Sequence, residues 1–192
     1  MANLKKLLYL TLPFLFYACL NNSKNVETHN SSNKNSLDSI IKALALGNCV
    51  ESEYVGAAGQ TSSQWSYYEQ LQNMATIEQL IDLTNHKSGV VRCYAFEALL
   101  KTKHDTIFSV LLKHSKDTLH VITRNGCLGG TELVSDYFVK TIRYNEEGDY
   151  QLNARQQHIL DSVFIYDKSN TFFWGKLFAE DNSQNKASKK HM

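Results

Sequence analysis

The sequence contains very little proline. The one proline of this 192-residue chain, Pro13, lies close to the amino terminus, so no later proline removes a backbone N–H from a helix. Alternating Val-rich segments, which are typical of half-buried strands, are also absent. Both absences favour an all-α protein.

The chain also lacks a dominant charge. Its formal net charge is +1, and removal of residues 1–18 would leave 18 basic and 19 acidic residues. A nucleic-acid-binding domain usually carries a clear excess of basic residues. We therefore expect no nucleic-acid partner and no basic patch for a membrane surface.

Motifs of known catalytic or metal sites are missing as well. The sequence contains no HExxH, no GxSxG and no CxxC, and the loop Gly56–Gly59 lacks the Lys-Ser/Thr pair of a phosphate-binding loop. We expect no enzyme activity, no catalytic residue, no metal and no cofactor. One alternative is a hydrolase-like envelope enzyme, with a site assembled across helices from His114, Asp117 or His86. Another is a structural protein without a specific ligand.

Cysteines are few and their number after Cys19 is odd. Cys49, Cys93 and Cys127 allow at most one disulfide, and Cys93 with Cys127 is the pair that a repeat arrangement would bring together. Buried free thiols are the alternative that we favour.

What is present at the amino terminus is an export signal. Lys5 and Lys6 precede an apolar run over residues 7–18, which is shorter than the 20 or so residues that span a bilayer. The run ends at Ala18 and resembles a bacterial lipoprotein signal, which implies lipidation of Cys19. We expect a signal peptide over residues 1–18, a polar tether over 19–35 and a lipid-anchored protein exported to the cell envelope. Secretion without lipid and an uncleaved anchor are the alternatives.

The segment Thr76–Leu100 has the pattern of two helices joined by a turn. Thr76 and Gln79 form a capping box, and Lys87–Gly89 interrupts the helical pattern. The apolar positions of the second helix recur at helical spacing. They are Val91, Tyr94, Ala95, Ala98 and Leu99.

The order Leu80-Ile81, Val90-Val91-Arg92 and Ala95-x-x-Ala98-Leu99 resembles one HEAT-type helical repeat. Thr106-Ile107 repeats Thr76-Ile77 thirty residues later. The resemblance implies a short α-solenoid-like array of helix pairs, about nine helices over residues 36–180, followed by a disordered tail over 181–192. By analogy with such repeats, Arg92 would hold the turn or a carboxylate such as Asp82.

Stacked helix pairs expose a row of second-helix side chains that suits a peptide or protein ligand. Here the polar residues of that helix are Arg92, Glu97 and Lys101, and we take them as candidate binding residues. The alternative is a helix face that is only solvated. The expected function is a membrane-tethered scaffold that binds another envelope protein or peptide.

Overall fold

A computed structural model of the chain describes residues 36–145, 150–166 and 171–190. The chain divides into two compact units, Met1–Ser39 and Ile40–Met192. Of the first unit, only residues 36–39 are described, and they belong to a helix over residues 36–47. The predicted signal peptide, the tether and Cys19 lie outside the described residues.

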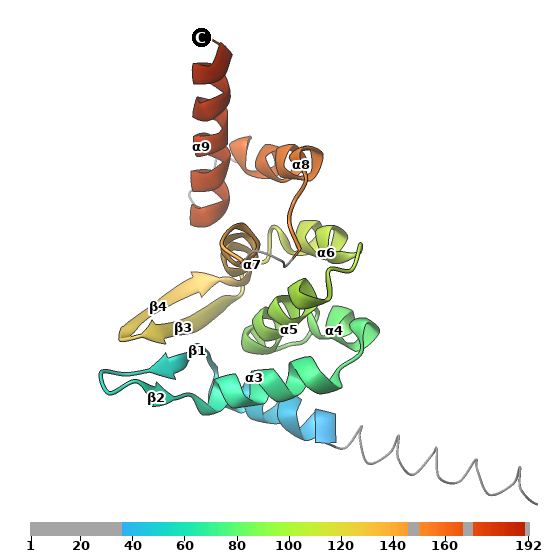
Figure 1. The fold of residues 1–192 in the computed structure, drawn as a ribbon, viewed down its shortest axis with the longest axis vertical. Coiled ribbons are helices and arrows are strands. Elements are labelled where there is room, and N and C mark those ends of the chain that lie inside the picture. Colours follow the sequence, from blue (N-terminus) through green and yellow to red (C-terminus); the bar gives the residue numbers. More distant parts are fainter. Residues whose placement is uncertain (1–35, 146–149, 167–170, 191–192) are drawn as a thin grey trace, which may run out of the picture. The chain divides into compact units, whose positions relative to one another are not determined.

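The second unit combines helices with one four-stranded sheet (Figure 1). The strands are β1 (Cys49–Val55), β2 (Gln60–Thr61), β3 (His120–Gly126) and β4 (Leu128–Leu133). The helices are α3 (Ser63–Met74), α4 (Ile77–Leu83), α5 (Gly89–Thr102), α6 (Ile107–His114), α7 (Val134–Arg143), α8 (Ala154–Ile165) and α9 (Phe173–Lys190). Helix α9 thus extends through most of the segment that we expected to be a disordered tail.

The predicted all-α fold is wrong, because the described residues contain a mixed sheet of order β2-β1-β3-β4. Strands β1 and β3 are parallel, whereas β1 with β2 and β3 with β4 are antiparallel. The clearest strand signal was the β-branched run Val121–Thr123, followed by a two-residue turn at Gly126 and Cys127. Gly126 has φ +56°, which suits a glycine in the first position of a hairpin turn.

The sheet also rules out the HEAT-type repeat. A second copy of the repeat would need a second helix after α6, but Val121 and Ile122, which follow α6 in the sequence, lie in β3. Only the first helix of that copy is present, as α6. The chain therefore contains a single α4–α5 helix pair of the predicted pattern and no solenoid among the described residues.

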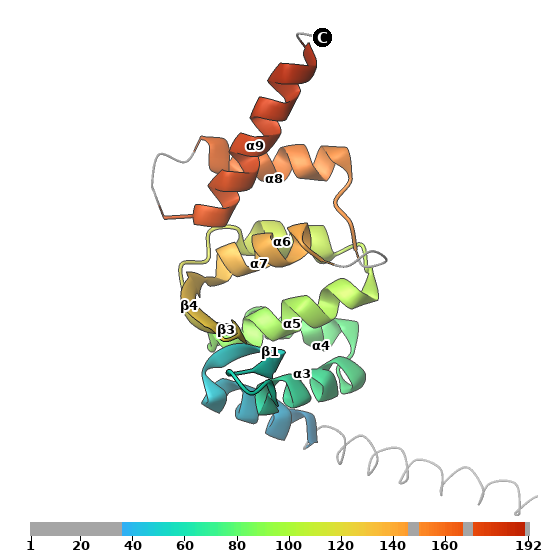
Figure 2. The ribbon, with the colours of Figure 1, turned by 60° about the vertical axis from the view of Figure 1, so that its left-hand side comes forward.

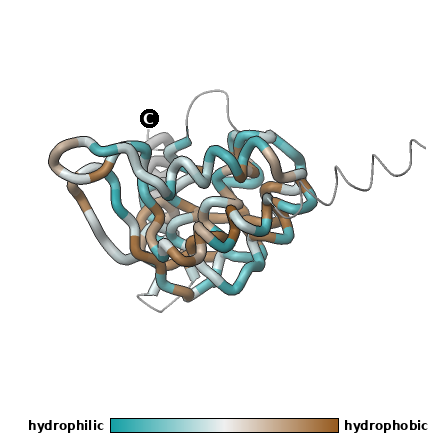
Figure 3. The backbone as a smooth tube through the Cα atoms, turned by 90° about the horizontal axis from the view of Figure 1, so that it is seen from below, coloured by the Kyte–Doolittle hydropathy of each residue, from teal (hydrophilic) through white to brown (hydrophobic). Residues whose placement is uncertain are grey.

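Helix α5 is the centre of the second unit. Ten of its residues are buried, on every side of the helix, including Val91, Tyr94 and Leu99 at 0% exposure. Figure 2 shows α5 in the layer between α3 and the pair α6–α7, and Figure 3 shows apolar residues along the interior helices. A helix that is apolar on all sides is typical of a core element. The single apolar stripe that we predicted understated this burial.

The predicted capping box at Thr76 is confirmed, and a second box starts α8. Thr76 and Gln79 form a complete capping box at α4, and Asn153 and Gln156 form another at α8. At α3 the cap is Ser62, whose side chain accepts the Trp65 N–H. These starts depend on hydrogen bonds between neighbours in sequence, which is why the sequence predicts them well.

Candidate functional site

The three candidate binding residues of α5 do not all lie on one face of the helix. Arg92, Glu97 and Lys101 are the charged residues of a helix that is otherwise almost entirely buried. At about 100° per residue, Lys101 lies about 40° around the helix from Glu97, whereas Arg92 lies about 140° from it. Glu97 and Lys101 therefore share one face, and Arg92 points elsewhere.

Arg92 holds the turn before α5, as the structural interpretation of the sequence proposed. Its Nε donates a hydrogen bond to the carbonyl of His86 at 2.5 Å, and its Nη1 donates to Oδ2 of Asp117 at 2.5 Å. The carboxylate partner is thus Asp117 and not Asp82. Because its guanidinium donates to both the His86 carbonyl and the Asp117 carboxylate, Arg92 stabilises the fold at this end of α5.

Asp117 accepts hydrogen bonds from three different groups. Besides Arg92, it accepts hydrogen bonds from the Leu119 N–H at 3.1 Å and from His114 Nδ1 at 3.4 Å. Burial alone would raise the pKa of Asp117, but the hydrogen bonds from His114, Leu119 and Arg92 outweigh it and lower the pKa from 3.8 to about 2. The carboxylate is therefore ionised at any ordinary pH.

The structure brings together His114 and Asp117, two residues of the alternative hydrolase hypothesis. His114 is only 7% exposed, and its Nε2 is buried with no hydrogen-bond partner among the described residues. His86 lies at the adjacent turn, where its Nδ1 accepts the Ser88 N–H. A catalytic base must reach a substrate, so this buried pair is better explained as part of the packing around α6.

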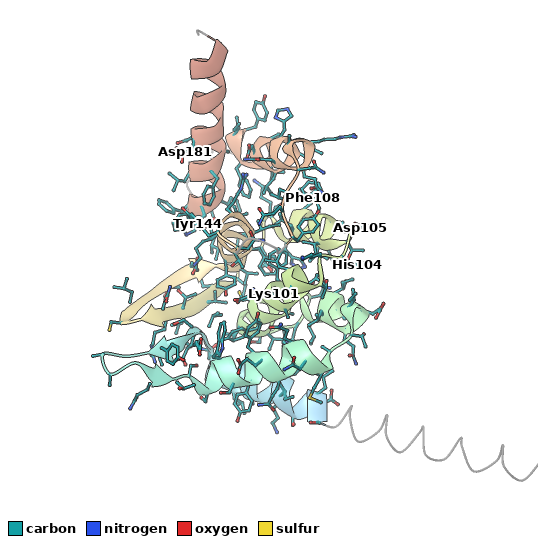
Figure 4. The ribbon with its side chains drawn as sticks, in the orientation of Figure 1. Lys101, His104, Asp105, Phe108, Tyr144 and Asp181 are labelled. Atoms are coloured by element: carbon teal, nitrogen blue, oxygen red, sulfur yellow. The ribbon has the colours of Figure 1, made fainter. Side chains whose placement is uncertain are left out.

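A cleft of about 660 Å³ lies on the opposite side of α5 from Arg92. We call it the α3–α5–α7 cleft, after the three helices that form its walls. Glu97, Leu100 and Lys101 contribute from α5, and Trp65, Tyr68, Glu69 and Gln72 from α3. Lys101 and Tyr144, which caps the end of α7 directly after Arg143, are both labelled in Figure 4. The volume is typical of pockets that hold a small molecule or a few residues of a peptide.

One hydrogen bond and one ion pair organise the wall between α5 and α7. The Tyr137 hydroxyl donates to Oε2 of Glu97 at 2.8 Å. Burial, together with the negative charge of Glu97, raises the pKa of Tyr137 well above its usual value, so the hydroxyl remains a donor. Lys140 forms an ion pair with Glu132 at 2.5 Å and lies 5.1 Å from the Tyr137 ring centre. These contacts fix the positions of Glu97 and Lys140 before any ligand arrives.

A smaller lobe of about 230 Å³ continues the cleft towards the sheet. It shares Trp65, Glu97, Asn125, Lys140 and Thr141 with the larger lobe. Such sharing makes the two lobes parts of one groove.

The smaller lobe adds its own ion pair, between Arg124 Nη1 and Oε1 of Glu51 at 3.0 Å. Glu51 also accepts a hydrogen bond from Ser62, and the Tyr94 hydroxyl contacts the Glu51 backbone. The acidic partner of the pair is therefore held in place, while the Arg124 side chain remains 51% exposed.

Sequence reasoning missed most of this groove. Trp65 was not among the candidate binding residues, but it is half-buried and forms part of the cleft wall. Asn125 was missed because strand β3 was not predicted. The signal that pointed to the site was the pair Glu97 and Lys101, whose spacing of four residues places them together on one face of a largely buried helix.

The three cysteines in the described part of the chain are unpaired: Cys49 and Cys93 are buried and Cys127 is exposed. The bridge between Cys93 and Cys127 is therefore absent. Cys93 is a buried free thiol, as expected, and its burial raises the pKa of the thiol well above the usual value. Cys127 is a free thiol too, but it is exposed, which differs from the expectation. A buried, protonated thiol is not a reactive nucleophile.

Two negative findings concern the described residues only. Among them, no group of three or more His, Cys, Asp or Glu side chains is arranged to bind a metal ion. None of the helices in the described part combines the length and the apolar character needed to cross a membrane.

No protein family model, no curated protein and no solved structure shows a significant match to this chain.

Proposed function

We propose that this chain is an exported, lipid-anchored protein of the cell envelope that binds a segment of another protein or peptide in the α3–α5–α7 cleft. The observation that supports the binding role is the convergence of Glu97 and Lys101 with aromatic side chains on one preformed groove of about 660 Å³. The groove is independent of the repeat architecture, so the proposal does not depend on the HEAT resemblance.

The anchor is a separate part of the proposal, and residues 5–19 of the sequence support it. A charged start, a short apolar run and Ala18-Cys19 are the features of a lipidation signal. Metabolic labelling with a fatty acid tests this part. We expect the wild type to incorporate the label and the Cys19→Ala variant to lack it; equal labelling of both would refute the anchor.

The binding role is tested by cross-linking in native membranes. The full chain carries an affinity tag, and cross-linked partners are recovered and quantified at increasing expression levels. We expect a saturable partner whose yield falls strongly in the double variant Glu97→Gln and Lys101→Ala. The control variant is Lys42→Ala, because Lys42 is exposed and lies outside the groove. A failure to recover any saturable partner would contradict the proposed function.

A further inference from the structure

We infer that the ligand of the α3–α5–α7 cleft is an extended peptide segment that carries both an acidic and a basic side chain. This inference rests on the proposed binding function and specifies the chemistry of the ligand. Four properties of the groove support it: its length, the polar groups on its walls, its charge balance and the position of Trp65.

The length of the groove suits about three residues of an extended chain. Along α7 its lining runs from Tyr137, in the smaller lobe, to Tyr144, in the larger lobe. At 1.5 Å of rise per residue this is about 10 Å of helix. An extended peptide advances about 3.3 Å per residue, so a single amino acid would leave most of the groove empty.

The walls provide side-chain groups that can pair with a peptide backbone. Three walls are helices, whose backbone groups are largely used within the helix, so the ligand must be held by side chains. In the part of the chain that the structure describes, the carboxamides of Gln72 and Asn125 have no partner, and both side chains are exposed. A carboxamide contains a donor and an acceptor, and can therefore bond to the N–H and the C=O of one peptide unit.

The charges on the groove are balanced. The larger lobe has Glu69 and Lys101, the two lobes share Glu97 and Lys140, and the smaller lobe has the pair Glu51 and Arg124. A ligand with charges of one sign would meet as many repulsive groups as attractive ones. A segment with one acidic and one basic residue can place each opposite its complement, which is how charge patterns provide specificity.

Trp65 offers a hydrogen-bond donor at the junction of the two lobes. Trp65 belongs to both lobes, and its ring lies 4.8 Å from the Tyr68 ring centre at an angle of 56°. Tyr68 therefore packs against the indole and helps to hold it in position. The indole carries an N–H donor, which can pair with a peptide carbonyl.

Trp65 also provides the signal for a binding experiment. The chain has two tryptophans, Trp65 and Trp174. The change Trp174→Phe leaves Trp65 as the only tryptophan and keeps an aromatic ring against Tyr144. The full chain carrying this change, in detergent micelles, is titrated with synthetic hexapeptides that contain Lys and Glu, only Glu, only Lys or only Ser and Gly. A soluble oligosaccharide of N-acetylglucosamine is titrated in parallel.

We expect a saturable change in Trp65 fluorescence with the Lys- and Glu-containing peptides and a much weaker one with the other probes. Lys101→Ala should raise the Kd of those peptides about fivefold, as the loss of an exposed ion pair does. Lys42→Ala should leave the Kd unchanged, and thermal melting confirms that both variants fold.

Three results would overturn the inference: no binding of any peptide, equal binding of single-sign peptides, or tighter binding of the saccharide. These results are distinct from a failure of the proposed function. If a saturable membrane partner is recovered equally from wild type and from the Glu97→Gln, Lys101→Ala variant, the protein binds a partner but does not use this groove.

Discussion

Arg92 and Asp117 form an ion pair that joins the first turn of α5 to the segment before β3, across 25 residues of sequence. The two side chains are 20% and 10% exposed, so water screens the pair only in part. The same guanidinium donates to the carbonyl of His86. One residue thus fixes both the turn that precedes α5 and the approach to the sheet.

Replacement of Arg92 by alanine should destabilise the protein. The change leaves the Asp117 carboxylate and the His86 carbonyl without their donor, and the expected loss of unfolding free energy is about 2 kcal/mol. Arg92→Lys should recover less than half of this loss, because an ammonium on a single stem cannot replace a planar group that donates in two directions. Urea denaturation measures both changes. Unchanged midpoints would contradict a structural role for Arg92.

Acid should lower the unfolding free energy of the protein, because it protonates Asp117. Its pKa is about 2 in the folded state and 3.8 ordinarily, so the folded state favours the ionised form. The corresponding stability is complete above about pH 4 and is lost as the pH falls from about 4 to 2, by up to about 2 kcal/mol. Asp117→Asn should be less stable at pH 6 and should lose less on acidification. Denaturation curves at several pH values test this, and parallel profiles for the two proteins would refute it.

Gly89 should not tolerate even one added methyl group. A Cβ at this position would lie 2.5 Å from Cγ1 of Val121 and 3.2 Å from Val134, which belong to β3 and α7. Gly89→Ala should therefore cost about 1–3 kcal/mol, although alanine favours helix formation. Gly129→Ala is the matched control, because its Cβ would make only an ordinary contact of 3.7 Å. Similar thermal midpoints for the two variants would show that the packing at Gly89 is not tight.

Asp136 should hold the start of α9 in place. Its carboxylate lies in α7 and accepts the N–H groups of Phe173, Trp174 and Gly175 at 3.0, 3.0 and 3.3 Å. Asp136→Ala removes this long-range cap, and a loss of about 2 kcal/mol is expected. Hydrogen exchange should become faster at these three amides and remain slow in α5. Equally protected amides in the variant would show that α9 does not depend on Asp136.

The sequence predicted best the features that depend on neighbours. The capping boxes at Thr76 and Asn153 and the α4–α5 pair require only contacts three or four residues apart. The sheet was missed because β1 pairs with β3 about seventy residues away, as Cys49 does with Ile122. Its strands are also short and carry polar or glycine residues on the exposed face, so they lack strong alternation. Neither segment alone therefore has a residue pattern that identifies it as a strand.

The sequence predicted only part of the candidate site, and again it was the part that depends on neighbouring residues. Glu97 and Lys101 are four residues apart on one helix, so their common face follows from helical geometry. Asn125 and Lys140 reach the same groove through the β3–β4 hairpin, and Trp65 reaches it through α3. Their convergence depends on the sheet, and an all-α interpretation could not have placed them together.

The location of ligand binding is the central claim, and site-specific photo-cross-linking in cells tests it most directly. A photoreactive amino acid is introduced at position 101, inside the groove, or at position 42, outside it, in the full lipid-anchored chain. We predict a discrete cross-linked product from position 101 that weakens when Glu97→Gln is added, and no such product from position 42. A product from position 42 alone, or equal products from both positions, would contradict the account.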